Sequence, residues 1–205
     1  MGAPVHHRML LIYHDAWFTT VTGVVFTAIV ALPLLPLVAG VLARIRQVLG
    51  MSPRRAWRRS ALDVGLVYGV GVPIWLTMLP GGNREISLVP FRDMATMPPY
   101  EILGNMLLLA AVGALVPLRF RALASVPRAT LVAMALSCAI ETCQYILPIG
   151  RVASVDDVIL NTAGAALAAL GSRMWWKPGA RGNALTREAS EEGDTLTSDP
   201  ILLTR

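Results

Sequence analysis

The sequence predicts an all-α membrane protein with about five transmembrane helices. Of its 205 residues, 55% are hydrophobic and only 15% are charged, whereas about a quarter of a soluble domain is charged. The charges also leave long gaps, with 28 uncharged residues at 16–43, 20 at 64–83 and 17 at 102–118. A single soluble core could bury one such segment but not a series of them. Aromatic residues make up 6%, and apolar and polar residues do not alternate in these segments, which argues against an outer-membrane barrel.

Each apolar segment is assigned one helix. The first is longer than the apolar part of a signal peptide, which spans about 7–15 residues, so we expect it to be retained. Pro33 and Pro36 should kink this helix near its end, which helices in lipid tolerate. Trp175 and Trp176, next to Lys177, are typical of a helix end anchored at the membrane interface. The predicted helices are Trp17–Leu42, Ala61–Leu79, Glu101–Leu118, Ala129–Leu147 and Val155–Trp176.

The basic residues of the connections predict the orientation of these helices. Lysine and arginine gather in the cytoplasmic connections of membrane proteins. Only Arg8, Arg84, Arg92 and Arg151 lie on one side of the predicted membrane. We therefore expect the N-terminus outside and the C-terminus in the cytoplasm. The opposite, cytoplasmic side holds Arg44, Arg46, Arg54, Arg55, Arg58, Arg59, Arg119, Arg121, Arg128, Arg173, Lys177 and Arg181.

This orientation divides the chain into four parts. Residues 1–16 form a short extracytoplasmic N-terminus, and residues 17–86 hold two transmembrane helices joined by a basic cytoplasmic loop. Residues 87–177 form a three-helix region, and residues 178–205, with five of the thirteen acids and no aromatic residue, are predicted to be a disordered cytoplasmic tail. The basic loop, RIRQVLGMSPRRAWRR, accounts for the net charge of +5 by fixing topology and contacting anionic lipid, so no nucleic-acid partner is expected.

The few strongly polar side chains inside the predicted helices share one depth. At a rise of about 1.5 Å per residue, they lie roughly 18–24 Å from the arginines that mark the cytoplasmic ends of their helices. Residues three or four apart face the same way, and the short connection PIGRVAS makes the last two helices antiparallel neighbours, so Arg151 is expected directly above two aspartates. One aspartate could be only a helix cap. The group consists of Asn105, Glu141, Gln144, Asp157 and Asn161, with Arg151 and Asp156 just above.

Several motifs from Ser87 to Gly171 resemble those of the VanZ-like family of small bacterial membrane proteins. They are LVPFRD, the Gly-Asn of EILGNMLL, the Glu-x-x-Gln of ETCQ, and then GR and DDVILN. The sequence departs from the family pattern at AAVGAL, where only Gly113 is kept, and at Ala153–Ser154, which replaces an acidic residue. The resemblance implies a role in the cell envelope of the plasma membrane, with glycopeptide (teicoplanin) resistance as the association of the founding member and no established catalysis. Its matching positions are Pro90, Phe91, Arg92, Asn105, Glu141, Gln144, Arg151, Asp156, Asp157 and Asn161.

Three uses of this polar group compete. The first is binding, in which an outward-facing pocket holds a membrane lipid head group, a lipoglycopeptide or a cell-wall precursor through Arg92 and Arg151. The second is catalysis on a lipid-linked phosphate, with Glu141 and Asp157 as candidate catalytic residues, Glu141 as general acid or base, and Mg²⁺ as the cofactor. The third is proton-linked transport, which would require an oligomer because five helices show no inverted repeat. Binding is favoured, and for it no cofactor or metal is expected.

Purely structural roles compete with all three uses. Asn105, Gln144 and Asn161 could hold helices together, a contact worth about 0.6 kcal/mol on average in membranes. Glu141 is harder to explain in this way, because a carboxylate in the apolar zone costs about 2.5 kcal/mol or more, and it must stay protonated or pair with a cation such as Arg92 or Arg151. The small pairs at Gly65 and Gly69, and at Gly164 and Ala168, indicate helix packing. The spacing of Cys138 and Cys143 argues against a disulfide, and His6, His7 and His14 are not expected to bind metal.

Overall fold

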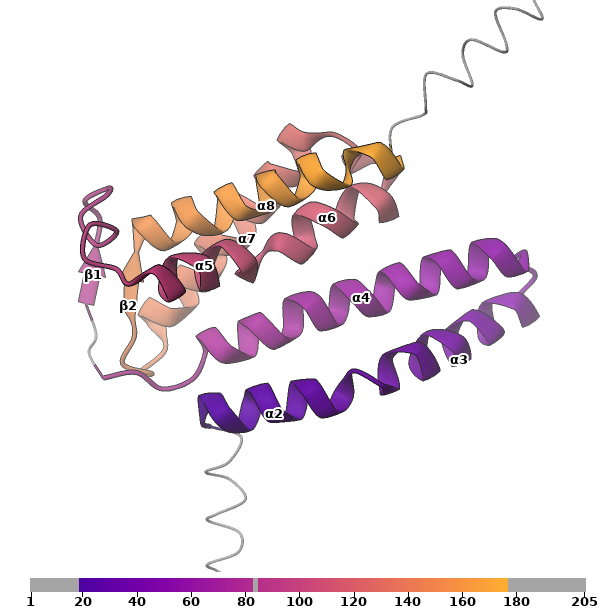
Figure 1. Cartoon of the computed structure of the whole chain (residues 1–205), viewed down its shortest axis with the longest axis horizontal. Helices are drawn as coiled ribbons and strands as arrows, with labels where there is room; N and C mark the ends of the chain where they lie inside the picture. The colour runs from indigo at the N-terminus through magenta and orange to yellow at the C-terminus, as the bar shows by residue number, and fades with distance from the viewer. Residues whose placement is uncertain (1–18, 83–84, 177–205) are drawn as a thin grey trace, which may run out of the picture.

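Helices and one short sheet make up the part of the chain that the structure, a computed structural model, describes: residues 19–82 and 85–176 (Figure 1). The predictions for the N-terminal segment and its histidines, for Trp17, for Lys177 and for the tail fall outside these ranges. The helices are α2 (Val21–Ala31), α3 (Leu34–Val48), α4 (Pro53–Thr77), α5 (Pro99–Leu108), α6 (Ala110–Arg119), the 3-10 turn η1 (Arg121–Leu123), α7 (Val126–Ile146) and α8 (Val155–Trp176).

Helix α8 lies at the centre of the fold. It packs against α5, α6 and α7, while α4 packs against α6 and against α3. Small residues permit this close packing: a Cβ atom at Gly164 would overlap the carbonyl of Met106, and one at Gly69 would overlap the side chain of Ala111. The packing role predicted for these two glycines is therefore confirmed. The buried core consists of Leu108, Leu109, Val112, Val116, Ala133, Ile140 and Ala165.

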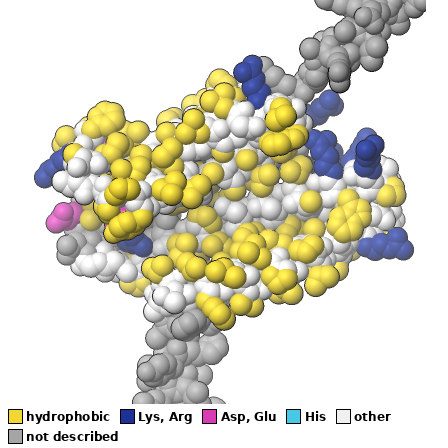
Figure 2. All heavy atoms as spheres, in the orientation of Figure 1, with side chains coloured by type: hydrophobic (Ala, Val, Ile, Leu, Met, Phe, Trp, Pro, Cys, Tyr) yellow, Lys and Arg dark blue, Asp and Glu magenta, His cyan; other side chains and the backbone are white. Residues whose placement is uncertain are grey.

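The outer surface of the helices is apolar, as expected for contact with lipid. Large hydrophobic side chains such as Phe26, Leu37, Val67 and Leu167 are more than half exposed, and Figure 2 shows apolar side chains over the flanks with most of the basic side chains at one end. Monomeric soluble proteins rarely expose apolar surface on this scale. Among the described residues, α4, the α5–α6 pair and α7 are long and apolar enough to cross a membrane, and the bent α2–α3 pair would make a fourth crossing.

Three differences from the predicted helices concern their number and shape. The predicted helix Glu101–Leu118 is divided at Leu109 into α5 and α6. The fifth predicted span, α8, coincides with the expected range Val155–Trp176 but is not among the helices apolar enough to be counted as a span. The first span is bent by 52° between α2 and α3. Pro33, which has no N–H to donate, lies at this break, so the kink occurs at one of the two predicted prolines. It falls in the middle of the pair rather than near the end because α3 continues to Val48.

The basic segment between the first two spans is helical rather than a loop, which corrects the prediction. Helix α4 begins at Pro53 instead of Ala61, and only residues 49–52 separate it from α3. Arginine is a good helix former, and Pro53 suits the first helical turn. The carboxylate of Asp63 on α4 then pairs with Arg46 of α3, at 2.6 Å, and with Arg119 of α6. These ion pairs join three helices at what we call the basic end of the molecule.

The opposite end, which we call the sheet end, contains a sheet that the sequence did not predict. Strand β1 (Glu85–Ser87) pairs in parallel with β2 (Val152–Ser154), so that Ser87 lies opposite Ser154. The backbone N–H of Gly81 also donates to the carbonyl of Ile149, at 2.7 Å. The next residue, Gly150, has a positive φ of 65° that glycine adopts without strain. These contacts fasten the segment after α4 to the segment before α8.

Candidate functional site

The deepest carboxylate at the sheet end, Asp156, organises the loop between β1 and α5. It is fully buried in the first turn of α8 and accepts hydrogen bonds from the backbone N–H groups of Phe91, at 2.6 Å, and of Asp93 and Met94, at 3.0 Å each. Phe91 has a positive φ of 64°, a strained conformation for a bulky residue. Asp156 therefore holds the loop in a shape that it would not adopt alone.

Glu141 is connected to the same loop through strand β2. Its carboxylate accepts a hydrogen bond of 2.9 Å from the backbone N–H of Ser154, the last residue of β2. The Ser154 hydroxyl in turn donates to Asp93 at 2.8 Å. The neighbouring Ser87 hydroxyl and then that of Ser154 hold the pKa of the Asp93 carboxyl below its ordinary value. Glu141 on α7, β2 and the loop are thus connected through Ser154.

Two amides join α8 to the helices beside it. Asn105 of α5 donates to Asp157 of α8 at 2.6 Å, and Asn161 of α8 donates to the buried hydroxyl of Ser137 on α7 at 2.8 Å. The predicted convergence of polar groups from three helices is therefore found in the structure. Asn161 is 1% exposed, so its place is between helices rather than at a surface.

Arg151 was expected directly above the two aspartates, and it lines the same pocket as Asp157 but pairs with neither aspartate. Its guanidinium donates instead to the carbonyls of Leu79, at 3.0 Å, and Leu76, at 3.1 Å, at the end of α4. The last carbonyls of a helix have no partner within the helix and carry partial negative charge, so a cation is stabilised there. Gln144 donates to the Thr77 carbonyl at 2.9 Å, in the same turn.

Of the two alternatives left open for Glu141, pairing with an arginine is not found, because the ion pairs in the described part of the chain involve only Asp63. Arg92 is exposed and points to no acid within ion-pair distance among the described residues.

Strands β1 and β2, the loop before α5, and the first turns of α5 and α8 surround a pocket of about 760 Å³, which we call the sheet-end pocket. Of the predicted site residues, it is lined by Asn105, Arg151 and Asp157, whereas Arg92, Glu141, Gln144, Asp156 and Asn161 do not belong to its lining. Three further carboxylates face the pocket, which makes it acidic overall. The charged residues of the lining are Glu85, Asp93, Glu101, Arg151 and Asp157.

Sequence reasoning missed Glu101 and Asp93 as pocket residues. Glu101 precedes Asn105 by four residues on α5, and this spacing alone would have placed both side chains on one face. Asp93 is adjacent to a motif residue, but its direction depends on the loop conformation that Asp156 sets. Within the described residues, no group of three or more His, Cys, Asp and Glu is placed to hold a metal ion. Cys138 and Cys143 are free and exposed.

Comparison with known proteins identifies the family. A family model described as VanZ/LLP1 matches residues 64–176, more than half of the chain. The chain belongs to the VanZ-like family. The VanZ-like region contains most of α4 as well as the last three predicted helices, and α4 supplies the carbonyls that Arg151 and Gln144 bind. No curated protein and no solved structure matches the chain.

Proposed function

We propose that this VanZ-like chain is a multi-pass plasma-membrane protein that binds the polar part of a cell-envelope lipid or lipoglycopeptide in the sheet-end pocket. The observation that carries this proposal is the convergence of α5, α8 and two loops on one acidic pocket at the end of a bundle with apolar flanks. The arginine counts support an orientation with this end outside the membrane. A ligand whose apolar part lies in lipid could reach the pocket with its polar part.

The charged side chains that line the pocket favour one kind of polar group in the ligand. Four carboxylates face the pocket, whereas the single guanidinium, on Arg151, already donates to two carbonyls. Carboxylates accept hydrogen bonds from ammonium and hydroxyl groups and repel phosphate. We therefore expect a ligand rich in hydroxyl or ammonium groups, such as an amino sugar or a glycopeptide, rather than a phosphate held by Arg92 and Arg151.

Glu101 is the residue most suited to direct contact with the ligand. It is exposed in the first turn of α5, lines the pocket, and its carboxylate has no hydrogen-bond or ion-pair partner among the described residues. Asp157 lies beside it and uses one carboxylate oxygen for Asn105. Glu141, in contrast, would act only through Ser154.

The test is binding of teicoplanin to the full-length chain in phosphatidylcholine nanodiscs, with empty nanodiscs as the blank. The double variant Glu101→Gln and Asp157→Asn should weaken binding at least about tenfold, because a hydrogen bond to a charged group contributes about 1.5–3 kcal/mol. The matched control is Arg92→Gln, which removes an exposed charge at the same end but outside the pocket, and should stay within about twofold of the wild type. Absence of binding by the wild type, or an equal loss in the control, would contradict the proposal.

A further inference from the structure

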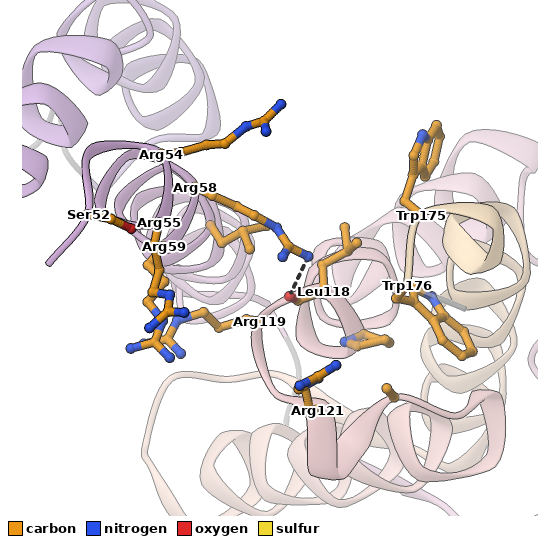
Figure 3. Close-up of a pocket in the computed structure, with 13 residues that line it drawn as sticks. Ser52, Arg54, Arg55, Arg58, Arg59, Leu118, Arg119, Arg121, Trp175 and Trp176 are labelled. Atoms are coloured by element: carbon orange, nitrogen blue, oxygen red, sulfur yellow. Dashed lines mark hydrogen bonds between the residues drawn. The ribbon is translucent and has the colours of Figure 1, made fainter. Parts of the chain in front are cut away.

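The basic end contains a second cavity that the sheet-end site does not involve. Its volume is about 1280 Å³, and it lies between the first turns of α4, the end of α6 with η1, and the end of α8. Figure 3 shows the arginines of α4 on one side, Trp175 and Trp176 of α8 on the other, and Leu118 and Arg121 between them. We call this the basic cavity. Its six arginines are Arg54, Arg55, Arg58, Arg59, Arg119 and Arg121.

Most of this positive charge is not neutralised within the described part of the chain. Arg119 pairs with Asp63, and Arg58 donates to the Leu118 carbonyl at 3.5 Å. The other four arginines have no hydrogen bond or ion pair to described residues, and no aspartate or glutamate lines the cavity. Like charges held this close repel one another, so an anion bound among them would be stabilised by each. A guanidinium also matches the geometry of a phosphoryl group, to which it donates two parallel hydrogen bonds.

The remaining lining residues indicate that the anion belongs to an amphiphile. Leu62, Pro117 and Leu118 contribute apolar surface beside the arginines, and Trp175 is two-thirds exposed. Tryptophan is enriched at membrane interfaces, where its ring contacts the boundary of the acyl chains and its N–H faces polar groups. The cavity lies at the N-terminal end of α4 and the C-terminal end of the α5–α6 pair, both long and apolar enough to cross a membrane. Arginine and tryptophan therefore meet at the level of the lipid head groups.

We propose that the basic cavity binds the phosphoryl head group of an anionic phospholipid, with the acyl chains lying against the apolar flank of the helices. The two ends of the molecule would then select opposite charges. This inference does not depend on the proposed function, because the two cavities share no residue. It differs from general attraction of basic segments to anionic membranes in requiring the arginines that line the cavity rather than any arginines at this end.

The experiment measures lipid binding by native mass spectrometry of the full-length chain in neutral detergent, with phosphatidylglycerol or phosphatidylcholine added. We expect the wild type to retain phosphatidylglycerol in preference to phosphatidylcholine. The variant Arg55→Gln, Arg59→Gln and Arg121→Gln should lose this affinity at least about tenfold, since each basic residue near the surface contributes about 1 kcal/mol. These arginines have no partners among the described residues, so the fold should be retained, and the thermal unfolding temperature checks this.

The matched control removes the same charge from the same end: Arg44→Gln, Arg128→Gln and Arg173→Gln, none of which lines the cavity. It should retain phosphatidylglycerol binding within about twofold. An equal loss in both triple variants would overturn the defined site in favour of diffuse attraction. Displacement of the lipid by millimolar inorganic phosphate would show a site for the free anion and would overturn the lipid assignment.

A final arm tests the acidic C-terminal segment as a competing occupant. Residues 178–205 follow Trp176 closely and include Glu188, Glu191 and Glu192. If the lipid binds only after Glu188→Gln, Glu191→Gln and Glu192→Gln are introduced together, the segment rather than lipid occupies the cavity, and the proposal is wrong. Unchanged lipid binding in this variant supports the proposal.

Discussion

Asp156 allows a sharp prediction because one buried carboxylate accepts three backbone N–H groups. Asp156→Asn keeps the shape of the side chain but leaves a single oxygen. In its better orientation this oxygen serves Asp93 and Met94, and the new NH₂ group then faces the N–H of Phe91. A buried donor without a partner costs about 1–3 kcal/mol, and the two retained hydrogen bonds lose their charge assistance. We therefore expect the loop to be destabilised by about 2–3 kcal/mol.

The assay is amide hydrogen exchange of the loop, residues 88–98, followed by mass spectrometry in detergent. A loss of about 2–3 kcal/mol in opening free energy corresponds to roughly 30- to 150-fold faster exchange. Asp157→Asn is the control, because this neighbour lies in the same helical turn and contacts Asn105 rather than the loop. Unchanged exchange in Asp156→Asn, or equal acceleration in the control, would refute the idea that this carboxylate holds the loop.

Three further predictions concern packing, charge and pH. Gly164→Ala should lower the unfolding temperature, because the added Cβ would overlap a carbonyl of α5 and overpacking costs about 1–3 kcal/mol. The control, Gly171→Ala, places its Cβ in open space and should not lower the unfolding temperature. Asp63→Asn should destabilise the chain by about 1–3 kcal/mol in denaturant titrations, since it leaves two arginines with weaker partners. The pKa of Asp93 is lowered in the fold, so its contribution to loop stability should be complete above the ordinary aspartate pKa and disappear as pH falls through the lowered value. Ser154→Ala should reduce this pH dependence, measured by exchange of the loop.

Hydropathy predicted the bounds of α7 and α8 to within a few residues. Helix α8 matches its predicted range, and α7 begins three residues early, at Val126, after the Ser125 side chain that accepts from the N–H of Arg128. The start of α4 was missed because hydropathy detects contact with lipid, not helix, and the eight residues 53–60, which include four arginines, extend the helix beyond its apolar part. Strands β1 and β2 were missed because three-residue strands carry no readable pattern, and their pairing joins distant segments.

The sequence predicted the depth of the site residues along their helices, but not the direction in which their side chains point. Helical rise placed Asn105, Asp157 and Glu141 at one depth, and the structure joins Asn105 to Asp157 and Glu141 to Ser154 at the same end of the bundle. Which of them lines a pocket and which does not depends on how the loops pack, and this cannot be read from spacing. The same reason explains Arg151, whose partners are carbonyls of α4 that no sequence pattern marks.

The parallel pairing of β1 with β2 has a consequence for biosynthesis. Strand β1 is made early, yet its partner emerges only after α5, α6 and α7 have been synthesised. Until then the wall of the sheet-end pocket has no second strand and Asp156 cannot clamp the loop. A nascent chain arrested before Val152 would expose an incomplete sheet end to quality-control proteases, and cleavage there should cease abruptly once α8 has packed against the other helices.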